Sequence, residues 1–192
     1  MWGSFKIQRL FFVLRWPLYG YGVFVALLIA IHLSSPDPHV VSFPASCPAG
    51  SKLGCSRVAE TAPHTNRGLV PFILDGTSRE TAQTMVVTWI MDSGAAVLLN
   101  SPGFVHARFV SWLWGFADDF FLSVRCNEQG NAVIEVQGQL RIGKSDLGVN
   151  LRRNKRLWEY LTEQQVNESM VLGEATQTCN QTFGQQRTLD RA

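Results

Sequence analysis

The chain of 192 residues has few of the residues that usually reveal a function from sequence. Its four cysteines are too few for a disulfide-rich scaffold, and they contain no paired C-x-x-C spacing of a zinc site. No two of its four histidines stand at the spacing of metal ligands, and no serine or cysteine lies in a nucleophile elbow. We therefore expect no metal site, no cofactor and no familiar hydrolase nucleophile.

Charge is scarce as well, with 17% charged residues and a formal net charge of +2. A nucleic-acid surface needs basic residues interleaved with exposed aromatic ones, and none is expected here. The segment Gly138–Ser145 matches the G-x-x-x-x-G-K-S pattern of a phosphate loop. Its inner residues alternate like a strand, however, and no helix-forming run follows Ser145 directly, so we expect no nucleotide.

A long apolar run stands near the start of the chain. Residues 1–15 are basic, and residues 16–33 form an apolar stretch of 18 residues. A helix of that length just crosses a hydrocarbon core about 30 Å thick, so the sequence predicts one transmembrane helix at 16–33, in contact with the lipid bilayer. The preceding cations place the N-terminus in the cytoplasm, stroma or matrix, and everything after the helix on the opposite side. A cleaved signal peptide is the alternative interpretation.

The rest of the chain divides by composition. Residues 34–66 contain five of the eight prolines and are expected to form an extended linker. An α+β domain is expected over residues 67–165, and a flexible polar tail over residues 166–192. Within the domain, strand-like and helix-like patterns follow one another in an order that predicts a small antiparallel sheet with two helices packed on one face.

The polar residues that could carry chemistry gather between residues 104 and 150. His106 with Asp119 or Asp146 is a candidate acid–base pair, the only catalytic alternative that we consider. The candidate ligand-binding residues are Arg108, Arg141, Lys144 and Asn150. Within this set, Lys144 and Arg141 would clamp an anion. A polar network that only fixes the fold is the structural interpretation of the same residues.

Two further features are expected to shape contacts. Trp112, Trp114 and Phe116 make a dense apolar corner, here called the aromatic corner, which is the expected partner-contact surface if it is exposed. Cys47 and Cys55 lie in one Pro/Gly/Ser-rich loop. They form a disulfide if the compartment is oxidising, and two free thiols are the alternative.

Several short blocks resemble a known family. They are Cys47-Pro48 through Cys55, the Phe-x-His-Ala-x-x-x-Ser strand from Phe104, Gly115-Phe-Ala-Asp-Asp119, and Arg141-x-Gly-Lys-Ser-Asp-Leu-Gly-Val-Asn150 with Arg152-Arg153. Over about Cys47–Leu161 the chain is similar to the DUF1499 family, whose function is uncharacterised. The resemblance implies a small domain, frequently exported or membrane-tethered, and no established activity, cofactor or catalytic residue. The chain departs from the family pattern between Cys47 and Cys55, where the segment is longer and lacks Ser-x-Asn, and at Gln139, where the family tends to have Ser.

Two hypotheses follow. The first is a non-enzymatic accessory protein with a single-pass anchor, whose non-cytoplasmic domain binds a small ligand or a partner protein, such as a member of a membrane-protein complex. The second is a small hydrolase or anion-binding enzyme that uses His106 with an aspartate and the Lys/Arg clamp. The first is favoured because the sequence offers neither a nucleophile nor a metal set.

Overall fold

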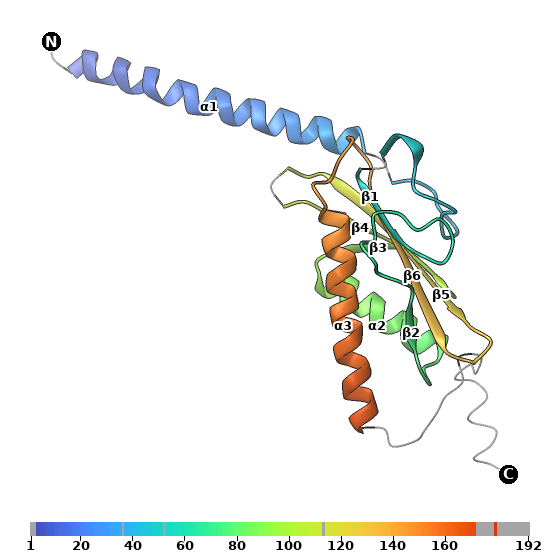
Figure 1. Cartoon of the computed structure of the whole chain (residues 1–192). Helices are drawn as coiled ribbons and strands as arrows, with labels where there is room; N and C mark the ends of the chain where they lie inside the picture. The colour runs from blue at the N-terminus through green and yellow to red at the C-terminus, as the bar shows by residue number, and fades with distance from the viewer. Residues whose placement is uncertain (1–2, 36, 52, 113, 172–178, 180–192) are drawn as a thin grey trace.

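The computed structural model describes residues 3–35, 37–51, 53–112, 114–171 and 179. Within these residues, six strands form one antiparallel sheet in the order β1-β6-β5-β4-β3, and β2 pairs with β6 on the same edge as β1. The strands are β1 (Cys55–Val58), β2 (Phe72–Leu74), β3 (Ala96–Ser101), β4 (Phe104–Val110), β5 (Ala117–Cys126) and β6 (Ala132–Leu140). The helices are α1 (Gly3–Leu33), α2 (Arg79–Asp92), α3 (Val149–Val171) and the short 3-10 helix η1 (Ala49–Ser51) (Figure 1).

One face of the sheet carries the hydrophobic core. Strand alternation places the buried side chains of Val105, Ala107, Phe120, Leu122, Ile134 and Val136 on this face. Helices α2 and α3 pack against it, as Figure 1 shows. The N-cap of α2 is Ser78, whose hydroxyl accepts from the Thr81 amide at 3.1 Å, and its apolar face buries Ala82, Val86 and Ile90. The expected sheet with two helices on one face is therefore present.

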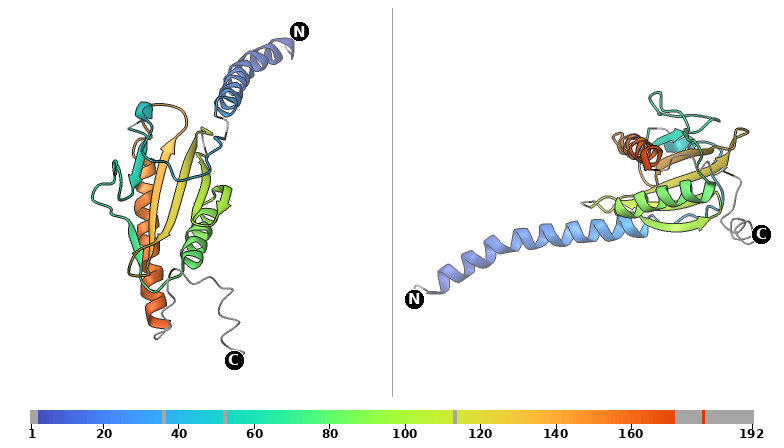
Figure 2. Two further views of the ribbon diagram at one scale, coloured as in Figure 1. Left: turned by 90° about the vertical axis from the view of Figure 1, so that its right-hand side faces the viewer. Right: turned by 90° about the horizontal axis from the view of Figure 1, so that it is seen from below.

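The expected membrane-spanning helix at residues 16–33 is wrong. In the part of the chain that the structure describes, no helix is both long enough and apolar enough to cross a membrane. These residues do form the second half of α1, which extends away from the domain (Figure 2). That half begins with Trp16, Pro17 and Leu18, and a run of tyrosine and glycine follows. Its strongly apolar part covers only residues 23–31, which at about 1.5 Å per residue is roughly 14 Å long, against about 30 Å for the hydrocarbon core.

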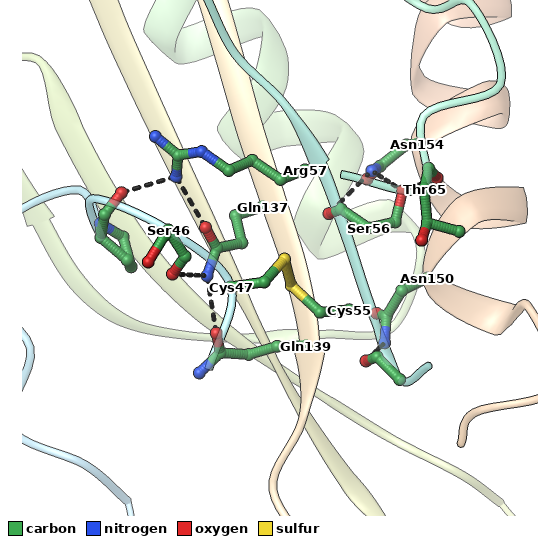
Figure 3. Close-up of a disulfide and its surroundings, with 12 residues drawn as sticks. Ser46, Cys47, Cys55, Ser56, Arg57, Thr65, Gln137, Gln139, Asn150 and Asn154 are labelled. Atoms are coloured by element: carbon green, nitrogen blue, oxygen red, sulfur yellow. Dashed lines mark hydrogen bonds between the residues drawn. A yellow bond between two sulfur atoms is a disulfide. The ribbon is translucent and has the colours of Figure 1, made fainter. Parts of the chain in front are cut away.

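The opposite face of the sheet is polar and is covered by irregular chain. Aligned residues across the strands place His106, Phe121, Gln137 and Arg57 in one row. Residues 37–50, here called the cover segment, lie over this row: the Pro44 carbonyl accepts from Arg57 at 2.5 Å, and the Ser46 carbonyl from Gln137 at 3.3 Å (Figure 3). The region 34–66, expected to be an extended linker, thus includes both this cover and β1.

Two disulfides, one across a short loop and one across a long loop, link parts of the fold. Cys47 in the cover segment is bonded to Cys55 in β1, as Figure 3 shows. Cys126 at the end of β5 is bonded to Cys179, which the sequence did not predict. Helix α3 continues to Val171, past the expected end of the domain at residue 165. Apart from Cys179, the rest of the expected flexible tail lies outside the described residues.

Candidate functional site

The polar face of the sheet brings together the main candidate residues in a buried network of His106, Asp119 and Arg141, here called the Asp119 network. His106 Nε2 lies 2.7 Å from Asp119 Oδ1, and each of these side chains is only 2% exposed. Arg141 donates to the same Oδ1 from Nη2 at 2.7 Å and from Nε at 3.1 Å. The imidazole also stacks on Phe121, with 4.7 Å between ring centroids. One aspartate oxygen therefore holds both the histidine and the arginine.

Arg141 has a second carboxylate partner at the start of the cover segment. Its Nη1 donates to Asp37 Oδ1 at 2.6 Å, and Arg108 Nη1 donates to both Asp37 oxygens at 2.9 and 3.0 Å. The hydrogen bond from Arg141 is the largest cause that holds the pKa of Asp37 below its ordinary value; burial acts against it and the charge of Arg108 adds to it. Burial lowers the pKa of Arg141, but its hydrogen bonds to Asp119 and Asp37 outweigh burial and raise that pKa.

A cleft of about 310 Å³ opens beside the Asp119 network. It is lined by Ser34, Ser35, Pro38, Pro48, Asp119, Gln139, Leu140 and Arg141. A second cleft, of about 360 Å³, lies between α2 and the β3–β4 turn and touches no residue of the network. The first cleft is the relevant one because two members of the network line it.

Asp146 and Asn150 lie at the start of α3, not beside His106. Asp146 accepts from the Gly148 amide at 2.9 Å and from the Asn150 amide at 2.6 Å, so it satisfies amides of the first helical turn. The Asn150 side chain donates to the Gly54 carbonyl at 3.2 Å and accepts from Arg153. The contacts of both residues lie around the start of helix α3. Of the two aspartates considered as acid–base partners of His106, the structure places only Asp119 beside it.

Asp118 and Asp119 point to opposite faces, as expected for neighbours on a strand. Asp118 faces α3 and accepts from Arg153 Nη2 at 3.2 Å. Burial raises the pKa of Asp118, and the charge of Arg153 only partly opposes this. Burial also lowers the pKa of Arg153, and the negative charge of Asp118 only partly opposes this shift. Lys144 is exposed in the turn between β6 and α3, outside both sets of contacts, and its clamping of an anion together with Arg141 stays a prediction.

Arg57 and Gln137 complete the polar layer, and the sequence reading did not assign them a role. The buried Arg57 guanidinium donates to Gln137 Oε1 at 2.6 Å and to the Thr61 carbonyl at 3.1 Å. Gln137 donates in turn to Gln139 Oε1 at 2.7 Å (Figure 3). Burial is the main cause that lowers the pKa of Arg57. The signal in the sequence was the alternation of Glu135, Gln137 and Gln139 along one strand.

The aromatic corner is exposed. Trp112 is 93% exposed, Trp114 45% and Phe116 42%. The corner adjoins α1, because the ring of Trp114 makes an edge contact with Phe24, with 6.0 Å between centroids. Three large aromatic side chains within five residues thus face solvent next to a helix that also exposes apolar residues.

Comparison with the curated proteins gave no match, and comparison with the solved structures gave none either. The family model that describes a protein of unknown function, DUF1499, matches residues 38–161, which include the whole sheet, α2 and the first half of α3. The blocks that carried the resemblance meet in the two networks described above, since His106, Asp119 and Arg141 lie on one face of the sheet and Asp118, Asn150 and Arg153 on the other. The chain belongs to the DUF1499 family.

Proposed function

We propose that the chain is a non-catalytic binding module of an oxidising compartment, and that it contacts a partner protein through the aromatic corner. The observation that carries this proposal is the 93% exposure of Trp112 beside the half-exposed Trp114 and Phe116. Exposed clusters of large aromatic side chains mark interaction sites, and tryptophan is enriched among the residues that dominate binding energies.

The exposed apolar surface continues from the corner onto α1. Phe24 contacts Trp114, and Val23, Leu27 and Ile29 on the same part of α1 are also exposed. A partner with an apolar surface that reaches from the corner to this part of α1 would remove both from water. The proposed occupant is therefore a protein with an apolar contact face.

The two disulfides support the choice of compartment. All four cysteines of the sequence are paired, as Cys47–Cys55 and Cys126–Cys179. Disulfides persist in oxidising compartments and are rare where glutathione and thioredoxin keep thiols reduced. The proposal therefore places the domain outside the reducing cytosol.

The test is affinity purification of the full chain from its native cells. The wild type is compared with two variants, each of which carries one substitution. Trp112→Ser removes the most exposed ring of the aromatic corner. Val70→Ser is the matched control, because it removes an apolar residue that precedes β2 and is 68% exposed. We expect one protein to be recovered in stoichiometric amount with the wild type and with Val70→Ser, and at least tenfold less with Trp112→Ser. Recovery that Trp112→Ser leaves unchanged, or recovery of a second copy of this chain alone, contradicts the proposal.

The second candidate function is an acid–base enzyme, and one observation favours it. His106 and Asp119 lie within hydrogen-bond distance, and Asp119 lines the cleft. Against it, both side chains are almost fully buried and Asp119 already holds Arg141. Hydrolysis of 4-nitrophenyl acetate or 4-nitrophenyl phosphate by the wild type, lost in His106→Gln while the variant stays folded, would replace the binding proposal with this one.

A further inference from the structure

Two arginines on the polar face converge on a single carboxylate that is not part of the sheet. Arg108 lies in β4 and Arg141 directly follows β6, where its amide donates to the Ala117 carbonyl at 3.2 Å. The sheet therefore fixes the positions of both guanidinium groups. Asp37 lies in the cover segment, only four residues after the end of α1 and one residue before the start of the family match. Two arginines fixed by the sheet thus hold the carboxylate of Asp37, which lies outside the strands and helices.

The charges on this face do not balance without Asp37. The Asp119 network already pairs Arg141 with Asp119. Within the described residues, Asp37 is the only acidic residue that pairs with Arg108, and Arg108 Nε is buried there without a hydrogen-bond partner. Removal of the Asp37 carboxylate therefore leaves two guanidinium groups against one aspartate, and Arg108 Nε is a donor without a partner even while Asp37 is in place. This surplus of positive charge and donors is what an anion would satisfy.

An incoming anion can reach the pair. Asp37 is 46% exposed, whereas Arg141, which the carboxylate covers, is only 6% exposed. Arg141 also lines the cleft of about 310 Å³, so a ligand in this cleft can contact the arginine that Asp37 binds. Arg108 Nη1 donates to both oxygens of the Asp37 carboxylate and Arg141 Nη1 donates to one of them, so the group that this pair holds in the structure is a carboxylate.

We propose that Arg108 and Arg141 form a binding site for a carboxylate-bearing ligand, and that Asp37 occupies this site as an internal ligand. The site is separate from the aromatic corner and goes beyond the partner contact proposed above. An internal occupant lowers the apparent affinity for a free carboxylate by the fraction of time that the site is open. If Asp37 fills the site for more than nine-tenths of the time, its removal raises that affinity at least about tenfold.

The test uses the full chain with Asp37→Asn, which keeps the size of the side chain and removes its charge. Acetate and succinate are titrated at constant ionic strength, and binding is followed by the NMR signals of the arginine Nε–Hε groups. We expect Asp37→Asn to bind at least tenfold more tightly than the wild type, and the double variant with Arg108→Gln to lose that gain. Glu128→Gln, which removes an exposed charge in the β5–β6 hairpin, is the matched control and should behave as the wild type.

The same titration identifies the source of the carboxylate. A short peptide with a free C-terminus is compared with its C-terminal amide: binding of the free acid alone indicates a peptide carboxylate, and binding of acetate and succinate alone indicates a free small acid. If Asp37→Asn binds carboxylates no more tightly than the wild type, the ion pair only tethers the cover segment and the proposal is wrong. If the asparagine variant does not fold, the same titration is carried out with Asp37→Ser, which also removes the charge.

Discussion

A single carboxylate at position 119 connects side chains from three neighbouring strands. Its Oδ1 lies within hydrogen-bond distance of His106 on β4 and accepts from Arg141 at the end of β6. The carboxylate is only 2% exposed, so its removal leaves the guanidinium of Arg141 without its buried partner. If the Asp119 carboxylate is removed, Arg141 keeps Asp37 as its remaining carboxylate partner.

We therefore expect Asp119→Ala to lower the free energy of unfolding by about 3–5 kcal/mol, the usual cost of removing one partner from a buried ion pair. Urea unfolding with the disulfides intact measures this change. Glu128→Ala, an exposed carboxylate, should change stability by no more than about 0.5 kcal/mol. A loss below about 1 kcal/mol for Asp119→Ala would mean that the buried network contributes little to the fold, and would strengthen the case that it is retained for chemistry.

The sequence could place His106 and Asp119 near each other but could not find Asp37. The two former residues lie on neighbouring strands, where strict alternation decides which side chains share a face. Asp37 is a lone acidic residue in a proline-rich stretch, and it reaches partners 71 and 104 positions further along the chain. No local periodicity encodes such a contact, because it depends on how irregular chain folds back over the sheet.

At the scale of elements, the docking of α3 depends on a close approach to β6. The Asn150 side chain lies over Gly138, and a Cβ at that position would meet Asn150 Oδ1 at 2.6 Å. Neither partner can withdraw easily, since Asn150 is buried and bonded to the Gly54 carbonyl. The glycine at 138 is thus required by the packing of helix on strand.

Gly138→Ala should accordingly destabilise the protein by about 1–3 kcal/mol, as expected when a well-packed site receives an extra methyl group. Gly50→Ala is the matched control, because a Cβ there meets nothing within 4 Å. Thermal unfolding of the two variants side by side checks the difference. Equal stabilities would show that α3 can shift on the sheet without cost.

The elements themselves were predictable to different degrees. Strand β4 (Phe104–Val110) is marked in the sequence, because His106 and Arg108 alternate with the apolar residues Val105, Ala107 and Phe109. Strand β1 was missed: it has only four residues, Cys55–Val58, and all four are buried, so no alternation marks it. The apolar residues of α1 were read as a membrane span, although hydrophobic content without sufficient uninterrupted length does not define one.

At the scale of the whole molecule, the sheet separates two different kinds of interior. The face under α2 and α3 is apolar, and its helices are held by burial of hydrophobic side chains. The face under the cover segment holds His106, Asp119, Gln137 and Arg57, all buried. A short irregular segment can bury little apolar surface, so its position depends on hydrogen bonds, the Asp37 ion pairs and the Cys47–Cys55 disulfide.

The two disulfides should therefore differ in what they contribute. Cys126–Cys179 joins residues 53 positions apart, and Cys47–Cys55 joins residues 8 positions apart. From the loop entropy alone, replacing both cysteines of the long loop by serine costs about 4 kcal/mol, and replacing both of the short loop about 2.5 kcal/mol. Urea unfolding of the two double variants measures the order. If the short-loop variant is the less stable one, the Cys47–Cys55 bond acts mainly by holding the cover segment over the polar face, because a bond that only shortens the unfolded chain cannot reverse the order set by loop length.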